Sequence, residues 1–438
     1  MPGSQERDRH EEFQLIPFPG SDDAAQISPN PLEQSVRQPI GAVVFERLQG
    51  VHQYALTAPS CFDEDKRGRI KASVLIPHRE HNIPSFVPAE AYFANHGISP
   101  EEIETLFDRW GTWRFRPYID DIYSLSASQV NRELSTALFP INNGVDRILD
   151  SLNPKGYNKH GIEHPGSVVS IAHRLLDLYP ANTHEEQESR KRLASIAGQA
   201  HDIGNIFYRD GHGHVSAQML ELLVPSVRGE KGKSVDERWK TIRKTIILHD
   251  SDNMQAVADS WGLDGEEKLD KLAATMKPEG LATLIADKVD VGYQRVSDAI
   301  LAGEIPEDIH AVVNAMSSHN AVEFEGDSLV WKLVYNPEIP DHLSKSLHFI
   351  PGWKRRLAEG EIDIPFQNWE KMFRHIYTDR MVTAALCSLA LFPFARKFEV
   401  QMVDERGNEL QENIVVARDS VDGDLDSLRQ QKSKLKTS

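Results

Sequence analysis

The chain has 438 residues, 40% of them hydrophobic and 26% charged, a composition typical of soluble globular domains. Asp and Glu number 66 against 49 Lys and Arg, and the net charge of −17 argues against general binding to nucleic acid or anionic membranes, although not against a local pocket for a phosphorylated small molecule. The 2 cysteines, Cys61 and Cys387, exclude a disulfide framework and a cysteine-rich zinc site, whereas 18 histidines stand out.

Residues 1–38 are rich in Pro, Ser, Gln and Asp without apolar periodicity, which predicts a flexible lead. The chain begins with a charged stretch that lacks the apolar run of a signal peptide. The longest nearly apolar run, residues 381–394, is shorter than the roughly 20 residues that span a bilayer. We therefore expect a cytoplasmic protein in which this run is a buried helix.

An N-terminal accessory region is expected over residues 39–153. Residues 69–77 predict a strand, and Ser99 followed by Pro100 predicts the start of a helix. The aromatic stretch 110–118 fits either a packing surface between domains or a platform for a base or another ring.

Residues 154–318 have helical periodicity and are expected to form a helical bundle domain. Apolar residues share one helical face in 164–176, in 235–249 and from Leu281 to Val291. Each of these stripes carries a His or an Asp, and such polar groups are costly in a core unless they are satisfied.

Residues 319–416 are expected to form a small α+β region. Alternating residues around 325–328 predict a hairpin, a helix follows over 365–391, and residues 397–416 predict a second hairpin. The remaining residues, 417–438, are polar and charged and predict a frayed tail. The expected fold is therefore mainly α.

The most informative motif is the pair His201-Asp202, which ends a predicted helix where Gly204 suits a helix break. Neutral imidazole and carboxylate are good ligands for Mn²⁺, Fe or Zn²⁺. Adjacent helical residues reach one ion only from a helix end or across a crevice of a bundle. His164 lies upstream and Asp287 downstream, each on an apolar stripe. Three more histidines lie between them: His212, His214 and His249.

The order His…His-Asp…His…His…Asp over about 154–300 resembles the HD-domain metal-dependent phosphohydrolase superfamily. The matching pieces are His164-Pro-Gly-Ser, Ala200-His-Asp-Ile-Gly204, His212-Gly-His-Val-Ser-Ala217, Ile247-Leu-His249 and Ala286-Asp-Lys-Val-Asp290. The resemblance implies an HD helical bundle that hydrolyses a phosphomonoester or phosphodiester bond with a metal-activated water. The implied substrate is a phosphorylated small molecule of nucleotide type. Nucleic acid and membranes are not expected partners, and a homo-oligomer is left open.

The resemblance also implies a ligand set for divalent metal ions, two of them in the longer version: His164, His201, Asp202, His212, His249 and Asp287. Asp202 would bridge both ions and so act in catalysis, and the ions would be Mn, Fe, Mg or Zn. His214 is the alternative to His212. His160 has the spacing of a leaving-group acid in the cyclic-nucleotide phosphodiesterase branch, and is otherwise a loop histidine. Four basic residues are candidate phosphate contacts, unless they form solvated helix faces: Lys159, Arg209, Lys288 and Arg295.

Departures from the family patterns narrow the range of HD-domain activities that the sequence allows. Asn205 after Gly204, and Asp-Ser-Asp-Asn after His249, disfavour the cyclic-di-GMP-cleaving HD-GYP group. The Glu-Asp pair of (p)ppGpp hydrolases and the His-Asp-x-Gly-His run of dNTP triphosphohydrolases are absent. Two other functions stay open, namely a non-catalytic module that senses metal and nucleotide, and a single-strand nuclease that uses the stretch 110–118 despite the net charge.

Overall fold

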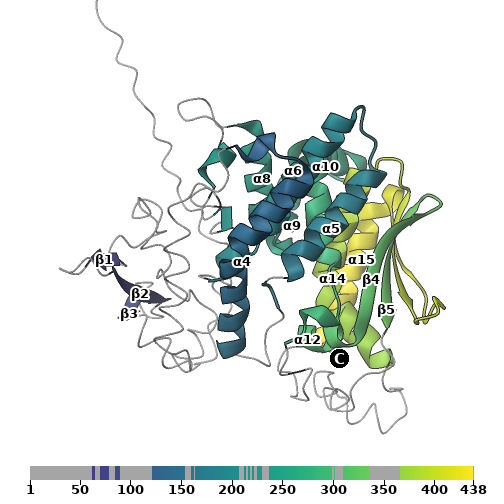
Figure 1. Cartoon of the computed structure of the whole chain (residues 1–438). Coiled ribbons are helices and arrows are strands. Elements are labelled where there is room, and N and C mark those ends of the chain that lie inside the picture. Colours follow the sequence, from purple (N-terminus) through teal and green to yellow (C-terminus); the bar gives the residue numbers. More distant parts are fainter. Residues whose placement is uncertain are drawn as a thin grey trace, which may run out of the picture.

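A computed structural model describes residues 62–64, 70–77, 84–88, 121–152, 159–161, 163–206, 212–213, 216–217, 220, 224–228, 236–297, 300, 309–335 and 366–437. Helices make up most of these ranges, and two small sheets accompany them, which confirms a mainly α chain (Figure 1). The predicted lead, the helix start at Ser99 and the aromatic stretch 110–118 lie outside the described residues. Among the described helices, none combines the length and the apolar character needed to cross a bilayer.

The first sheet consists of β1 (Phe62–Glu64), β2 (Ile70–Pro77) and β3 (Pro84–Pro88), all antiparallel with β2 in the middle. Strand β2 confirms the strand predicted over 69–77. Prolines stand at both ends of β3, which is an edge strand and therefore tolerates residues without an amide donor.

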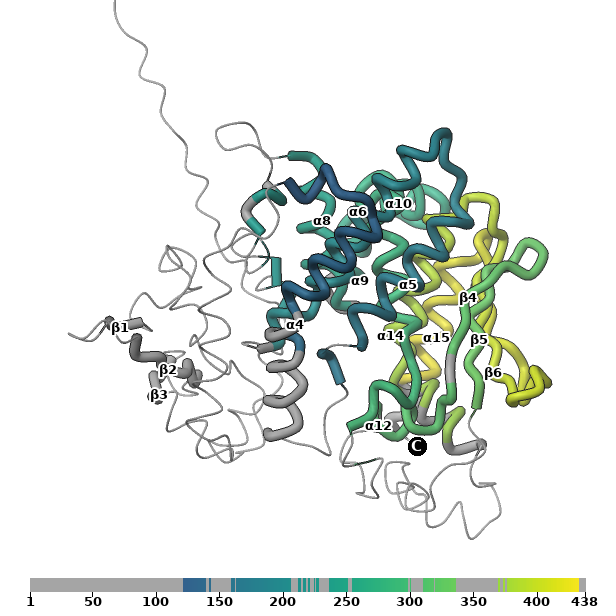
Figure 2. The backbone as a smooth tube through the Cα atoms, in the orientation of Figure 1, coloured from purple at the N-terminus to yellow at the C-terminus, as the bar shows by residue number. Residues whose placement is uncertain are grey.

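Helices form the body of the described part. Their bounds are α4 (Ala127–Leu152), α5 (Glu163–Leu178), α6 (His184–Ala200), α8 (Glu237–Leu248), α9 (Ser251–Ser260), α10 (Gly265–Val289) and α12 (Ile309–Ala315). Single 3-10 turns connect them: η4 (Ile122–Ser124), η5 (Ile203–Ile206), η6 (Pro225–Arg228) and η7 (Tyr293–Arg295). Helices α4 and α5 both pack against α6, and α10 packs against α5, α6 and α8 (Figures 1 and 2).

Capping residues fix where the helices of the bundle begin. The Thr183 hydroxyl accepts the backbone N–H of Glu186 at 3.1 Å at the start of α6, and the Asp236 carboxylate accepts that of Arg238 at 2.8 Å at the start of α8. Helices α5 and α8 confirm the apolar stripes predicted in 164–176 and 235–249.

Helix α10 is bent in its middle. Lys277 has φ 60° and ψ 162°, a conformation almost confined to glycine that costs about 1–3 kcal/mol in other residues. Pro278 then begins the second half of the helix, where its missing N–H is not needed. Every residue from Glu279 to Val289 is buried, so this half, which carries Asp287, lies entirely inside the protein.

The second sheet has the order β4 (Ser317–Glu325), β5 (Ser328–Tyr335), β6 (Lys397–Val403) and β7 (Ile414–Ala417). The β4–β5 and β6–β7 pairs are antiparallel and confirm the two predicted hairpins, whereas β5 and β6 are parallel. A parallel pair needs a long crossover connection. Helix α14 (Phe366–Leu391) lies in this connection and confirms the helix predicted over 365–391. It packs against both α10 and the sheet (Figure 2).

One hydrophobic core joins the helices to the second sheet. It continues from Val168 on α5 and Leu284 on α10, through Phe373 on α14, to Trp331 on β5, and all four side chains are buried. The apolar run beginning at Met381 is buried in the second half of α14, as predicted.

The C-terminal residues join the same core. After the 3-10 turn η9 (Arg418–Ser420), helix α15 (Val421–Thr437) buries Val421, Leu425 and Leu428 against it. The prediction of a frayed tail is therefore wrong for this helix. Its three apolar residues at helical spacing stand among polar residues that hide the pattern in the sequence.

Candidate metal centre

The C-terminal ends of three helices meet at one place. Helix α6 ends at Ala200 and is capped by His201, helix α8 ends at Leu248 and is capped by His249, and Asp287 lies in the last turn of α10. The rings of His201 and His249 have centroids 5.0 Å apart, and His201 Nε2 lies 3.7 Å from Asp287 Oδ1. Because helix C-termini carry partial negative charge, their convergence favours a cation.

His201 and His249 are oriented in the same way. The Nδ1 of His201 donates to the carbonyl of Gly198 at 2.9 Å, and the Nδ1 of His249 donates to that of Ile246 at 2.5 Å. Both carbonyls belong to a last helical turn, where no helical N–H reaches them. These bonds leave the Nε2 atoms of both rings facing the centre.

A first group contains His164 from α5, His201, Asp202 and Asp287. His164 Nε2 lies 3.1 Å from His201 Nε2, 3.3 Å from Asp287 Oδ1 and 3.5 Å from Asp202 Oδ2. His201 Nε2 lies 3.5 Å from Asp202 Oδ2. Neighbouring ligands of an ion with bonds of about 2.1 Å are about 3.0–3.4 Å apart. His164, His201 and Asp287 therefore have the spacing of metal ligands, and so do His160, His164 and Asp202.

The other carboxylate oxygen of Asp202 faces a second group. Asp202 Oδ1 lies 2.9 Å from His212 Nε2 and 3.4 Å from His249 Nε2, and the two nitrogens are 2.7 Å apart. These three residues could also hold a metal ion. Asp202 thus belongs to both groups, with a different oxygen in each.

Two glycines allow the segments of the second group to approach one another. A Cβ on Gly204 would lie 2.3 Å from the carbonyl oxygen of His212, and one on Gly213 would lie 2.6 Å from that of Ile246. Gly204 does not have a positive φ, so its small size rather than a left-handed helix end accounts for a glycine here.

The protonation states of His201, Asp202 and Asp287 suit a metal. Burial lowers the pKa of His201 to about 4, so its ring is neutral. Burial opposes ionisation of Asp202, but the neighbouring His201 and His160 outweigh burial and hold its pKa well below the usual range. Burial opposes ionisation of Asp287 in the same way, and Lys288, with Nζ 2.6 Å from Asp287 Oδ2, outweighs it. Neutral imidazole and ionised carboxylate are the forms that bind metal.

Sequence reasoning missed Asp290, which orients His164. The Nδ1 of His164 donates to Asp290 Oδ2 at 2.6 Å, and the Ser167 hydroxyl donates to Asp290 Oδ1 at 2.6 Å. Asp290 is only 1% exposed. A carboxylate behind a ligating histidine fixes its tautomer and increases its basicity. The position of Asp290, one helical turn after Asp287, was the available signal.

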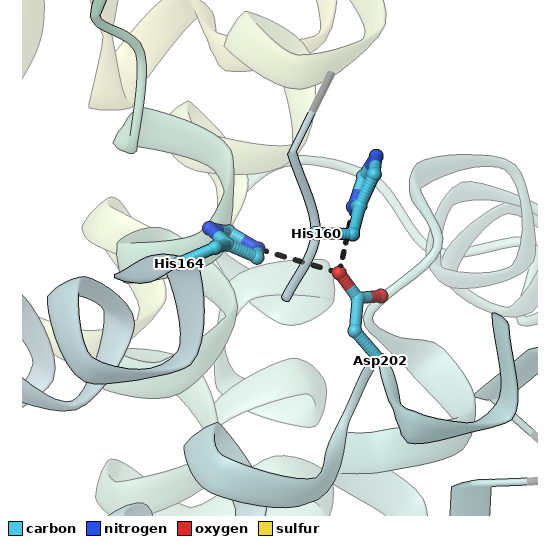
Figure 3. A group of neighbouring side chains, drawn as sticks. All are labelled: His160, His164 and Asp202. Carbon is cyan, nitrogen blue, oxygen red and sulfur yellow. Dashed lines mark hydrogen bonds and ion pairs between the residues drawn. The ribbon is translucent and has the colours of Figure 1, made fainter. Parts of the chain in front are cut away.

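His160 lies against Asp202. Its Nδ1 is 2.8 Å from Asp202 Oδ2 and 3.1 Å from Arg295 Nη2. Figure 3 shows His160 and His164 approaching the same oxygen of Asp202 from different directions. The backbone N–H of Lys159 donates to the Arg295 carbonyl at 2.7 Å, and Arg295 Nε donates to the Lys159 carbonyl at 3.3 Å. Arg295 therefore ties the segment that bears His160 to the end of α10.

The structure brings every described metal-ligand candidate into this centre, and none of them is more than 8% exposed. Among the basic candidates, Arg295 is 2% exposed and also donates to the Asp290 carbonyl at 3.2 Å, whereas Lys288 is 4% exposed and pairs with Asp287. Lys159 is partly buried. Arg209 and His214 lie outside the described residues.

The charge of the centre also fits a cation. Among the described residues, three buried carboxylates and two buried basic side chains lie at the centre, which leaves one excess negative charge when the histidines are neutral: Asp202, Asp287, Asp290, Lys288 and Arg295. Imidazole nitrogens and carboxylate oxygens together suit Mn²⁺, Fe or Zn²⁺. The residues present therefore fit a metal site.

No family model, curated protein or solved structure matches the chain. The resemblance to the HD-domain superfamily therefore stays a prediction from the motifs.

We expect Mn²⁺ to stabilise the protein more at high pH than at low pH. In the metal-free protein burial lowers the pKa of His164 and of His249, but neighbouring carboxylates outweigh it and raise both above 6.5. Protonated His164 and His249 therefore stabilise the metal-free fold below that pH, and this contribution is lost as the pH rises through the raised values. Metal needs the neutral rings.

The rise in melting temperature on adding Mn²⁺ should accordingly increase as the pH rises through the raised pKa values of these two histidines. Thermal melts recorded at each pH, once with Mn²⁺ and once with a chelator, measure this rise in melting temperature. A rise that is the same at every pH would contradict the involvement of these two histidines.

Proposed function

We propose that the chain is a metal-dependent phosphohydrolase of the HD type, which cleaves a phosphomonoester or phosphodiester bond of a small molecule, in particular a nucleotide. The observation that carries the proposal is the position of Asp202, whose two carboxylate oxygens face two separate groups of imidazole nitrogens. One carboxylate with a ligand group on each side is the arrangement that holds two ions a few ångströms apart.

Two divalent ions, Mn, Fe, Mg or Zn, would activate a water and stabilise the charge of a phosphoryl group here. The residues of the chain supply the geometry. Gly198 and Ile246 orient His201 and His249, Asp290 orients His164, and Lys288 holds the second oxygen of Asp287.

His160 is the candidate for protonating the leaving oxygen, because an imidazole exchanges protons near neutral pH. Its Nδ1 lies 2.8 Å from Asp202 Oδ2 and 3.1 Å from Arg295 Nη2, so both side chains contact the same nitrogen of the ring. The ring is 5% exposed, so bulk water has little access to it.

The test is hydrolysis by the full-length protein, stripped with a chelator and reloaded with Mn²⁺, Fe²⁺, Mg²⁺ or Zn²⁺. We expect hydrolysis of p-nitrophenyl phosphate, of bis-p-nitrophenyl phosphate or of a member of a nucleotide panel with at least one metal. Activity should disappear with the chelator and return with the metal.

Two outcomes would replace the proposal. Tight nucleotide binding by the metal-loaded protein without turnover of any substrate favours a sensing module. Cleavage of a short single-stranded oligonucleotide, with no activity on small phosphate esters, favours a nuclease.

A further inference from the structure

Arg380 on α14 is a partly buried cation beside the last turn of α10. Its Nη1 donates to the backbone carbonyl of Asp287 at 3.5 Å, and its guanidinium carbon lies 5.2 Å from the centre of the Tyr377 ring. It forms no ion pair with any residue that the structure describes. By contrast, Arg374 on the same helix pairs with Glu370 at 2.5 Å. The long contact to Asp287 uses one of the five N–H groups of Arg380, and no carboxylate in the described part of the chain pairs with the others, so these can bind a ligand.

Arg380 lies beside the candidate metal centre. The residue that it contacts, Asp287, belongs to the first ligand group, and a carbonyl oxygen is at most about 5 Å from the carboxylate of its own residue. The Nη1 of Arg380 is therefore within about 9 Å of the ligand atoms. Lys288 also contacts Asp287, with Nζ 2.6 Å from Oδ2.

Arg295 completes a group of three cations from α10, η7 and α14. Burial lowers the pKa of Arg295, and the positive charge of Arg380 lowers it further. Arg295 and Lys288 are 2% and 4% exposed, whereas Arg380 is partly exposed. Arg380 is therefore the one of these three cations that an incoming anion can reach.

We propose that the substrate carries a second phosphate group and that Arg380 binds it while the first phosphate group lies on the metal centre. This inference rests on the phosphohydrolase function proposed above. A guanidinium binds phosphate through two parallel N–H···O bonds, so it suits a terminal phosphate better than a neutral leaving group. The substrate class is accordingly a diphosphate, or a phosphate ester with another phosphate nearby.

The experiment compares inorganic phosphate with imidodiphosphate, a diphosphate analogue that resists hydrolysis, by calorimetric titration of the full-length Mn²⁺-loaded protein at a fixed, buffered free Mn²⁺ concentration. We expect imidodiphosphate to bind about tenfold or more tightly than phosphate, since hydrogen bonds to charged groups contribute that much. Arg380→Gln should remove this preference. Arg380→Lys should keep part of it, because lysine retains the charge but not the planar fork.

The matched control is Arg374→Gln, which removes a paired arginine from the same helix and should leave the preference intact. Two results overturn the inference: wild-type protein that does not prefer imidodiphosphate, or an Arg380→Gln variant that keeps the preference. Either result would mean that Arg380 only stabilises the C-terminal end of α10, through its hydrogen bond to the Asp287 carbonyl. Absence of all hydrolysis by the wild-type protein contradicts the proposed function instead, and the two titrations still decide the role of Arg380.

Discussion

Asp202→Asn is expected to empty both proposed metal sites at once. Asp202 Oδ2 lies 3.5 Å from both His164 Nε2 and His201 Nε2, and Asp202 Oδ1 lies 2.9 Å from His212 Nε2. An amide keeps the size of the side chain but offers one neutral oxygen and one NH₂ group that repels a cation. Metal analysis after gel filtration should fall from about two ions to fewer than one per chain, and hydrolysis should drop at least about 10²-fold.

Asp259→Asn is the matched control. Asp259 is exposed on α9 and lies 3.8 Å from Arg429, so the same chemical change there should leave metal content and activity unaltered. If Asp202→Asn lost one ion and kept the other, a shared bridging carboxylate would be ruled out. Unchanged hydrolysis of every substrate would rule out the phosphohydrolase itself.

The residues that sequence reasoning could find are those whose chemistry conflicts with their local pattern. A buried polar group on an apolar stripe needs a partner, and His164, His249 and Asp287 each break such a stripe. The adjacent pair His201-Asp202 can serve one centre only from a helix end, and the structure places His201 at the cap of α6. Apolar periodicity likewise sufficed for α5 and α8, because each buries one face, and the apolar run from Met381 sufficed for the second half of α14, which is buried on all sides.

The residues that sequence reasoning could not find owe their roles to contacts between segments that are far apart in the sequence. Asp290 looks like one more charged residue until α5 brings the Nδ1 of His164 within 2.6 Å of it. Arg380 reaches Asp287 only because α14 crosses α10. The kink at Lys277 has no signal except the following proline, since lysine rarely adopts its φ of 60°.

These long-range contacts share one consequence, which is that the C-terminal region supports the centre directly. Helix α14 contributes Arg380 at the last turn of α10, and the Tyr377 hydroxyl donates to Asn314 Oδ1 at 3.3 Å. The same Asn314 oxygen accepts the backbone N–H of Gly292 at 3.2 Å, just before the turn that carries Arg295. The segment that holds His160 is therefore positioned in part by residues far beyond the predicted bundle domain.

Asp290→Asn is expected to weaken metal binding without removing a ligand. The asparagine oxygen can still accept from His164 Nδ1, while its NH₂ group donates to the Ser167 hydroxyl in place of the present bond. The geometry is then preserved, but the negative charge that increases the basicity of His164 is lost. Replacing such a partner typically lowers metal affinity about 10- to 100-fold. Calorimetric titration with Mn²⁺ measures this loss of affinity. The number of ions bound per chain should stay as in the wild type.

Ser167→Ala separates charge from hydrogen bonding at the same carboxylate. It removes the donor to Asp290 Oδ1 and keeps the charge, so its effect on Mn²⁺ affinity should be clearly smaller than that of Asp290→Asn. Equal losses of Mn²⁺ affinity in the two variants would mean that the position of the Asp290 side chain, which Ser167 helps to fix, matters for metal binding and that its negative charge does not. Unaltered affinity in both would mean that His164 binds metal equally well without a carboxylate behind it.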